Sequence, residues 1–194
     1  DRLTQMNDWS GITTLSYDAL GQLNSIADPL TGTLTYSFDG AGNRVALNYP
    51  GGALTYAWDG SGRISQIGAP GGQLATLAFD ALNRPIWESL NGIGRSRSYD
   101  AAGNQLTENT QDSTGALLAA VTATYDAVGN RLTSLELDGS LTSFSYDAKN
   151  QLLREQRSGS NPYDLLYAYD LLGNRITKTR DGIITIFSYA PGNL

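Results

Sequence analysis

Carboxylates are the side chains of this sequence most able to do chemistry. The chain holds 19 Asp and Glu residues against 13 Lys and Arg residues, and it has neither His nor Cys. Two carboxyl groups facing each other are enough for glycoside hydrolysis, and several carboxylate oxygens together can bind calcium. The lack of His and Cys removes the commonest general base and the usual zinc ligands, and it excludes disulfides. Much enzyme chemistry is therefore excluded.

The glutamates do not form an evident catalytic pair. Glu88, Glu108, Glu136 and Glu155 do not share a place in the repeated pattern described below, so nothing in the sequence brings two of them together. We therefore expect no catalytic residue. An enzyme stays the third hypothesis for this chain, to be tested by asking whether a carboxylate variant abolishes a detected hydrolase activity.

An aromatic residue followed by Asp recurs along the whole chain. Successive copies lie 20 to 26 residues apart, and a fixed period of this length is typical of repeat proteins. The copies are Tyr17-Asp18, Phe38-Asp39, Trp58-Asp59, Phe79-Asp80, Tyr99-Asp100, Tyr125-Asp126, Tyr146-Asp147 and Tyr169-Asp170, with a degenerate ninth ending at Tyr189-Ala190. The chain is thus predicted to be a single array of about nine repeats over residues 1–194.

Each Asp opens a second pattern, in which Gly or Asn follows three residues later. Those residues are Gly21, Gly42, Gly62, Asn83, Gly103, Gly129, Asn150 and Gly173. Asp at the start of a type I turn accepts backbone N–H bonds, and Gly or Asn tolerates the left-handed conformation that closes such a loop. One Asp per copy is far short of the six to eight oxygens that calcium prefers. The pattern therefore predicts a tight structural turn, with no metal and no cofactor.

Residues before each Asp alternate in character, as in a half-buried strand. Leu54, Tyr56 and Trp58 share one face, whereas the other face is small or hydroxylated. A second strand follows each turn, for example 45–49, 64–67 or 132–137, and a variable turn then closes the repeat. Extra residues of the longer copies are expected in loops, at 111–115 and 158–164.

The predicted fold class is therefore all-β: tandem β-hairpins forming a long, curled antiparallel sheet of roughly sixteen to eighteen strands, a spiral or partial barrel-like shell. The aromatic face should be buried against another part of the sheet, with rings stacked in a ladder. If the Trp58 ring is core, Trp58→Ala should cost about 3–5 kcal/mol.

Charge and hydropathy narrow the partners. The net charge is -6 and the pI is near 4.5, without a sizeable basic cluster, so nucleic-acid binding is not expected. No run approaches 18 apolar residues, so we expect no membrane insertion by this segment. The start at Asp1 is neither an initiator Met nor a signal peptide, and we expect the chain to be a fragment of a larger protein.

The tandem motif, with Gly-Asn-Arg at 42–44, 129–131 and 173–175, resembles the YD repeat of the Rhs family, which includes Rhs polymorphic toxins, the C components of Tc toxins, wall-associated toxins and teneurins. The resemblance covers essentially the whole chain. It implies a spiralling β-sheet that closes into a hollow shell, which in bacterial members encloses a C-terminal toxin domain. The implied partners are the rest of the shell and that toxin or effector domain, and the implied localisation is secreted or delivered at the bacterial cell surface.

The sequence departs from the family pattern in three ways. Asp28-Pro29 lies in an expected hairpin loop and lacks the context of the family's Pro-rich boundary and aspartyl self-cleavage site. No variable toxin domain follows, and about nine copies are fewer than usually enclose a cavity. We therefore expect an arc of shell wall. The alternative is a carbohydrate-binding or adhesive surface module, because exposed rings could stack on glycans; saturable quenching of Trp fluorescence by glycans would distinguish the two.

Overall fold

The fold is an antiparallel ribbon of hairpins. The computed structural model describes residues 1–190, and in that range it contains eighteen strands that belong to one sheet. Every neighbouring pair of strands whose register is defined runs antiparallel, as between β4 and β5 at Tyr36 and Leu47. The predicted all-β class and the tandem hairpin order are confirmed. The chain divides into two compact units, Asp1–Gly94 and Arg95 onward.

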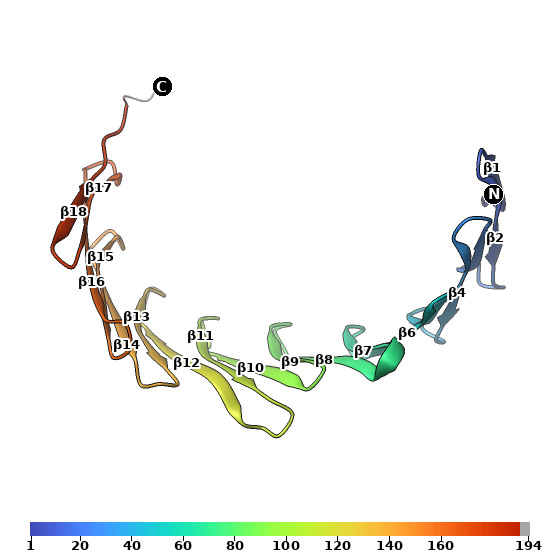
Figure 1. Ribbon diagram of the computed structural model, residues 1–194, viewed down its shortest axis with the longest axis horizontal. Helices are drawn as coiled ribbons and strands as arrows, with labels where there is room; N and C mark the ends of the chain where they lie inside the picture. The colour runs from blue at the N-terminus through green and yellow to red at the C-terminus, as the bar shows by residue number, and fades with distance from the viewer. Residues whose placement is uncertain (191–194) are drawn as a thin grey trace. The chain divides into compact units, whose positions relative to one another are not determined.

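The first unit contains nine strands joined in sequence order (Figure 1). They are β1 (Gln5–Asp8), β2 (Gly11–Tyr17), β3 (Leu23–Asp28), β4 (Gly32–Phe38), β5 (Arg44–Tyr49), β6 (Gly52–Trp58), β7 (Ile64–Ala69), β8 (Gln73–Phe79) and β9 (Pro85–Leu90). A 3-10 turn, η1 (Pro70–Gly72), joins β7 to β8, and Gly71 within it has a φ of 79°.

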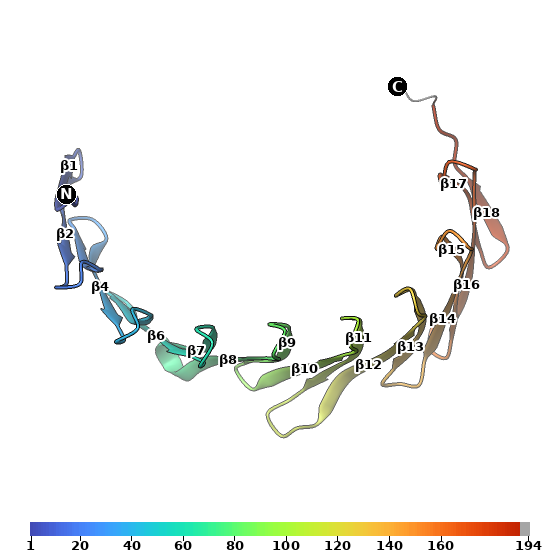
Figure 2. The same cartoon turned by 180° about the vertical axis from the view of Figure 1, so that it is seen from behind.

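The second unit continues the same order. Its strands are β10 (Ile93–Tyr99), which starts at the end of the first unit, β11 (Gln105–Gln111), β12 (Leu117–Tyr125), β13 (Arg131–Glu136), β14 (Leu141–Tyr146), β15 (Leu152–Ser158), β16 (Tyr163–Tyr169), β17 (Arg175–Arg180) and β18 (Ile183–Ile186). The hairpin of β11 and β12 projects further than the hairpins that follow it in this unit (Figure 2).

Two kinds of turn alternate along each unit. The Asp-x-x-Gly or Asp-x-x-Asn turns, here called Asp turns, join β2 to β3, β4 to β5 and so on, and they define the Asp-turn edge. The variable turns join β1 to β2 and β3 to β4, and they define the variable edge. A β-bulge accompanies the Asp turns: in the β2–β3 pair, Ser16 opposes Ser25 whereas Tyr17 opposes Leu23, so that Asn24 is skipped. Bulges at this place bend the strand and increase its twist.

The same register shift recurs directly before the aromatic residue in each of the seven Asp-turn hairpins whose register is defined. It falls at Ser16/Tyr17, Ser37/Phe38, Ala57/Trp58, Ala78/Phe79, Thr124/Tyr125, Ser145/Tyr146 and Ala168/Tyr169. An Asp turn closed by a left-handed residue produces such a bulge, because a type I turn followed by a left-handed residue adds one residue to the returning strand.

The side chains of the aromatic face pack against neighbours on the same sheet and not against a second layer. Among the described residues, the buried apolar side chains are Ala123 and Leu165, at 4% and 9% exposure. Trp58 and Tyr56 are only half-buried. We expected this face to be buried against another part of the sheet; within each unit it is covered only by neighbouring side chains of the same layer, because a single sheet has no second layer to place on it.

The two loops predicted for the longer copies, at 111–115 and 158–164, are confirmed in their central parts, because residues 112–116 and 159–162 lie between strands. The ends differ: Gln111 still belongs to β11, Ser158 still belongs to β15, and β16 already starts at Tyr163. Likewise β13 ends at Glu136, one residue before the predicted end, because Glu136 already begins the turn through its bond to Ser140.

Candidate functional site

The most regular polar site of the molecule is the Asp turn. In all eight copies the Asp N–H donates to the carbonyl four residues on, at 2.8–3.0 Å, and the Gly or Asn N–H donates back to the Asp carbonyl at 2.9–3.2 Å. One carboxylate oxygen also accepts the N–H four residues on at 2.8–3.0 Å, as Asp126 does from Asn130. The carboxylate is thus used within its own loop.

The structure places every predicted motif residue except Tyr189 in this loop or at its entrance. The third residues after Asp all have positive φ, between 62° and 95°, including the two asparagines. The aromatic residues Tyr17, Phe38, Trp58, Phe79, Tyr99, Tyr125, Tyr146 and Tyr169 end their strands. Tyr189 lies beyond β18, and its hydroxyl nevertheless bonds as in the other copies.

In six of the eight copies the second carboxylate oxygen binds a side chain four residues on, which is either Asn or Arg. Asn43, Asn104, Asn130 and Asn174 donate their side-chain amides at 2.9–3.0 Å. In two copies Arg63 and Arg84 take that place, each with Nε 2.7 Å from the carboxylate. The amide and the guanidinium therefore perform the same task, which is to hold the carboxylate across its turn.

These bonds favour the charged form of the turn carboxylates. The side-chain amide of the Asn four residues on lowers the pKa of Asp39, Asp100 and Asp170. The backbone N–H groups of Arg63 and Arg84 lower the pKa of Asp59 and Asp80. Burial acts in the opposite direction at Asp126, but the bonds from Asn130 outweigh it and that pKa is lowered too. A carboxylate stabilised as the anion is not a general acid at neutral pH.

In six copies the polar tip of the aromatic residue ties its hairpin to the one before it. Tyr146 donates its hydroxyl to the carbonyl of Arg131 at 2.9 Å, and Trp58 donates its indole N–H to the carbonyl of Arg44 at 3.0 Å. The same bond joins Tyr17 to Leu3, Tyr125 to Gln105, Tyr169 to Leu152 and Tyr189 to Arg175, at 2.8–3.0 Å. Phe38 and Phe79 have no polar atom with which to make it.

Strand pairing explains why those carbonyls need a partner. Between β5 and β6 the ladder starts at Ala46 opposite Thr55, two residues inside the Asp-turn edge. Arg44 lies outside that ladder on its β6 side, and its carbonyl is the one that Trp58 reaches. The pairs β13–β14 and β15–β16 likewise start two residues after the acceptor. The aromatic side chain therefore replaces a missing ladder bond.

The Arg of each Gly-Asn-Arg motif lies against aromatic rings. Arg44 has its guanidinium carbon 5.9 Å and 5.0 Å from the ring centroids of Tyr36 and Tyr56. Arg175 lies 5.5 Å from the Tyr167 ring and 5.0 Å from the Phe187 ring. Such cation–π contacts each contribute about 0.5–1 kcal/mol at exposed sites. These Arg side chains thus help to join neighbouring hairpins across the aromatic face.

At the variable edge of the first unit, the Pro of one turn packs against the Gly of the turn before it. A Cβ placed on Gly32 would lie 2.6 Å from the Pro50 ring, and one on Gly52 would lie 2.4 Å from the Pro70 ring. Only glycine allows the Pro of the following turn to approach so closely. These contacts between successive turns therefore depend on shape.

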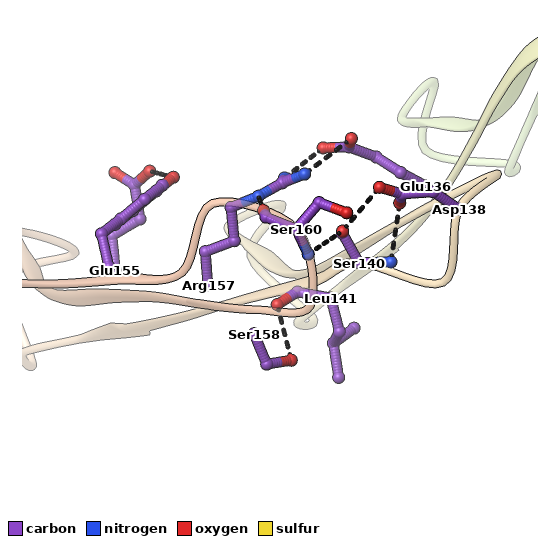
Figure 3. Close-up of polar contacts among 9 residues, drawn as sticks. Glu136, Asp138, Ser140, Leu141, Glu155, Arg157, Ser158 and Ser160 are labelled. Atoms are coloured by element: carbon purple, nitrogen blue, oxygen red, sulfur yellow. Dashed lines mark hydrogen bonds and ion pairs between the residues drawn. The ribbon is translucent and has the colours of Figure 1, made fainter.

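The second unit joins one pair of hairpins at this edge through a polar network (Figure 3). Arg157 on β15 forms a two-pronged ion pair with Glu136 at the end of β13, with one N–O distance of 2.9 Å. Ser140, which has no exposed surface, donates to Asp138 and accepts the N–H of Ser160 at 2.9 Å. The Arg157 bond lowers the pKa of Glu136. Because each polar group has a partner, the network holds the two turns together.

The acidic side chains of the described residues form no metal-binding cluster. Within residues 1–190, no three carboxylates gather closely enough to hold a metal ion. The structure also has, over the same range, no helix of the length and apolarity needed to cross a membrane. Glu136 and Glu155 are occupied by Arg157 and by the Tyr163 hydroxyl respectively.

Sequence reasoning missed several of these residues. Asp112 forms a ninth loop with Asp-turn bonding, in which Gly115 donates to the Asp112 carbonyl and Ala116 donates to its carboxylate. The Asp-x-x-Gly spacing was visible there, but no aromatic residue precedes it. The Glu136–Arg157 pair was signalled only by a separation close to one repeat. The aromatic tip bonds could have been sought from the preference for Tyr and Trp over Phe in the motif.

Comparison with known families identifies the repeat. Residues 17–55 match the family model of the RHS Repeat, which confirms the resemblance drawn from the motif. The matched segment contains two Asp turns and the complete hairpin between them. No sequence among curated proteins matches the chain.

Two solved structures share the fold. A crystal structure of TcdB2-TccC3 matches 91% of this chain at a TM-score of 0.64 and 18% identity. A structure of the same complex without its hypervariable C-terminal region matches 93% at a TM-score of 0.63 and 16% identity. The chain spans 11% and 12% of the length of those chains. At this identity the likeness shows that the ribbon of hairpins is a fold that occurs in a Tc toxin complex.

Proposed function

We propose that this chain is a wall segment of an Rhs-type shell that encloses a C-terminal toxin or effector domain, and that it works by sequestration, without catalysis. In this proposal the chain is one array of about nine repeats cut from a longer protein. Its partners are the rest of its own shell and the enclosed domain. The shell would be secreted or delivered at the bacterial surface.

The observation that carries the proposal is the repeated joint between hairpins. Tyr125, Tyr146 and Tyr169 each tie their hairpin to the previous one at the Asp-turn edge, and Arg157 does so at the variable edge. A wall must be continuous and closed to water at both edges of every hairpin, whereas an enzyme scaffold needs only one well-formed site. The RHS Repeat match and the shared fold of the TcdB2-TccC3 structures support the same reading.

The bonding of the carboxylates supports the non-catalytic part of the proposal. Turn carboxylates such as Asp59 and Asp126 are bonded within their own loops. Glu136 is held by Arg157. A carboxylate that already accepts two or more bonds is a poor base and a poor nucleophile. The proposal therefore gives these carboxylates structural roles.

A surface adhesion module is the second candidate, and the observation that favours it is the half-buried state of rings such as Tyr56 and Trp58. Rings that keep exposed surface can bind ligands, whereas core rings cannot. In that case glycans would quench Trp fluorescence in a saturable way.

The open reading frame of the parent protein separates the two candidates. The shell proposal expects further Asp-turn repeats upstream and a boundary followed by an unrelated domain downstream, and that domain would name the cargo. A signal peptide, a few repeats and a wall anchor would refute encapsulation and favour adhesion.

A further inference from the structure

The hairpin of β11 and β12 is longer than the hairpin that follows it, and this leaves part of β12 paired on one side only (Figure 2). The ladder with β11 extends to Leu117, whereas the ladder with β13 starts at Val121 opposite Glu136. Beyond Glu136 the chain turns back into β14. Within residues 1–190, the segment 117–120 is therefore an open strand edge on its β13 side.

The backbone of this open edge has groups directed at the empty side. Asp126, directly after β12, has its N–H and C=O bonded to Asn130 and Gly129, on the β13 side. Because successive residues of a strand direct these groups to opposite sides, Leu118 and Ala120 direct theirs to the same side as Asp126. Neither residue forms a backbone hydrogen bond with the β13–β14 turn. An edge of this kind is a template for one more strand.

The sequence does little to block that pairing. Residues 115–121 read Gly-Ala-Leu-Leu-Ala-Ala-Val, without the Pro or the charged side chain that commonly protects an exposed edge. Leu117 and Leu118 keep 48% and 55% of their surface exposed. A β-bulge skips Leu118 in the pairing with β11 and bends the strand there. The straight part of the edge therefore suits a short segment.

A hollow of about 330 Å³ lies along this edge and is here called the β12 notch. Leu118–Val121 line one side of it, and Glu136–Asp138 line the other. Val121 lies opposite Glu136, so these two residues share one face of the sheet, whereas Leu118 lies on the other face together with Leu135. An added strand would therefore have leucines beside one of its faces and a carboxylate beside the other.

The charge around the notch selects the partner. Glu136 and Asp138 line the notch, and the β11–β12 hairpin, residues 105–125, contains two acidic residues and no Lys or Arg. Arg157 offsets one of these charges through its pair with Glu136. A second copy of this chain would bring the same acidic hairpin to the notch, and like charges disfavour that pairing. A basic segment is favoured instead.

We propose that the β12 notch binds a short extended segment of a partner protein, in which apolar residues alternate with Lys or Arg. The segment adds to the sheet as a strand antiparallel to β12, in line with β13. Its backbone bonds to Leu118 and Ala120 supply affinity, and its side chains supply specificity. The apolar residues lie beside Leu118, and the basic residues lie beside Glu136 and Asp138. This site is independent of whether the ribbon encloses a cargo.

The test is a fluorescence anisotropy titration of the whole chain into a labelled, capped peptide, Thr-Val-Lys-Val-Lys-Val-Thr. Its valines would stand opposite Leu118 and Ala120 and direct their N–H groups at β12. A peptide with N-methylated valines keeps the charge but loses those donors, and a peptide with Glu in place of Lys reverses the charge. We expect saturable binding of the first peptide, with both others at least about tenfold weaker.

Hydrogen exchange and two variants locate the site. Bound peptide should slow exchange of the Leu118 and Ala120 amides. Leu118→Lys places a cation at the notch and should weaken binding about tenfold or more. Leu166→Lys is the matched control, because Leu166 is also exposed but lies on β16, which is paired on both sides there. It should leave binding within about twofold of the original. Circular dichroism and thermal melting check that both variants fold.

Several results would overturn the proposal. Absence of saturable binding up to roughly 5 mM protein would exclude even a weak site. Equal binding of the N-methylated peptide, which is measured on the unaltered chain, would exclude strand addition. Equal losses in the Leu118 and Leu166 variants would mean that the peptide responds to net charge alone. Self-association of the chain that Leu118→Lys abolishes would mean that a second copy occupies the notch. None of these outcomes bears on the shell, whose test lies in the parent gene.

Discussion

Removing a single hydroxyl at Tyr146 tests whether the aromatic tips join the hairpins. Tyr146→Phe keeps the ring on β14 and deletes only the bond to the Arg131 carbonyl, which is 2.9 Å long. A net hydrogen bond contributes about 0.5–1.5 kcal/mol, and water can partly replace the donor because the site is exposed. We therefore expect a loss of about 1 kcal/mol in the free energy of unfolding.

The chain contains its own control for this change. Phe38 ends β4 at the place that Tyr146 has in its own copy. Leu23 is the residue that corresponds to Arg131, and Phe38 and Leu23 line the same hollow of the first unit. Phe38→Tyr should restore the missing bond and gain a few tenths to about 1 kcal/mol. Because stability in a repeat array is approximately a sum over repeats and their interfaces, each change should act locally.

Urea denaturation followed by circular dichroism measures both effects, with hydrogen exchange in β13 and β14 to locate the first. The reasoning would be refuted by a Tyr146→Phe variant as stable as the original, or by a destabilised Phe38→Tyr variant. Tyr146→Leu should cost more than Tyr146→Phe, because it also removes ring packing.

Three further predictions follow from the turns and the aromatic face. Stability should fall as the pH drops below about 3.8, because the pKa values of Asp39, Asp59 and Asp126 are lowered on folding. A carboxyl group with a lowered pKa stabilises the fold at pH values above its pKa in the unfolded chain. That contribution is lost as the pH falls through its pKa in the folded chain. Urea midpoints at pH 6 and pH 3 measure it, and equal midpoints would contradict it. Gly62→Ala should lower the free energy of unfolding by about 1–2 kcal/mol from its φ of 74° alone, since open space surrounds it. Gly52→Ala should lower it more, because the added Cβ would meet Pro70. A smaller loss at Gly52 than at Gly62 would argue against the contact between Pro70 and Gly52. Trp58→Ala should cost about 2 kcal/mol rather than the 3–5 kcal/mol of a core ring, because Trp58 is half-buried, and a loss above about 4 kcal/mol in a thermal or urea melt would mean that another surface covers it.

The hairpins and Asp turns could be predicted from the sequence because their signals are local. Asp126 and Gly129 are three residues apart, and the turn that they form depends on little else. The alternation at Leu54, Tyr56 and Trp58 likewise indicates the strand β6 directly. Each signal is also repeated, so that the copies confirm one another.

The joints could not be predicted in the same way, because they depend on the register between hairpins. The bond from Tyr146 to Arg131 requires both the bulge after the Asp turn and the early end of the β13–β14 ladder. The burial of the aromatic face was overestimated for a related reason. Alternation shows that one face is less exposed than the other, but it does not show whether a second layer covers that face or neighbouring side chains of the same sheet do so.

The candidate site was predicted in part. The structure places the Asp, Gly and aromatic residues of the motif in one local arrangement, and their proposed role in the shell stays a prediction. Arg44 and Arg157 were not singled out. Their roles depend on contacts between hairpins: Arg44 on β5 lies against rings of β4 and β6, and Glu136 on β13 lies two strands away from Arg157 on β15.

Protection of the cargo by the wall is the most direct test of the central claim. The parent protein would be treated with a nonspecific protease, and survival of its downstream domain followed by mass spectrometry. Encapsulation predicts that this domain survives in the intact protein and is degraded when the joints are weakened together, as in a Tyr125→Ala, Tyr146→Ala and Tyr169→Ala variant. Equal and rapid degradation in the intact and weakened proteins would contradict the account.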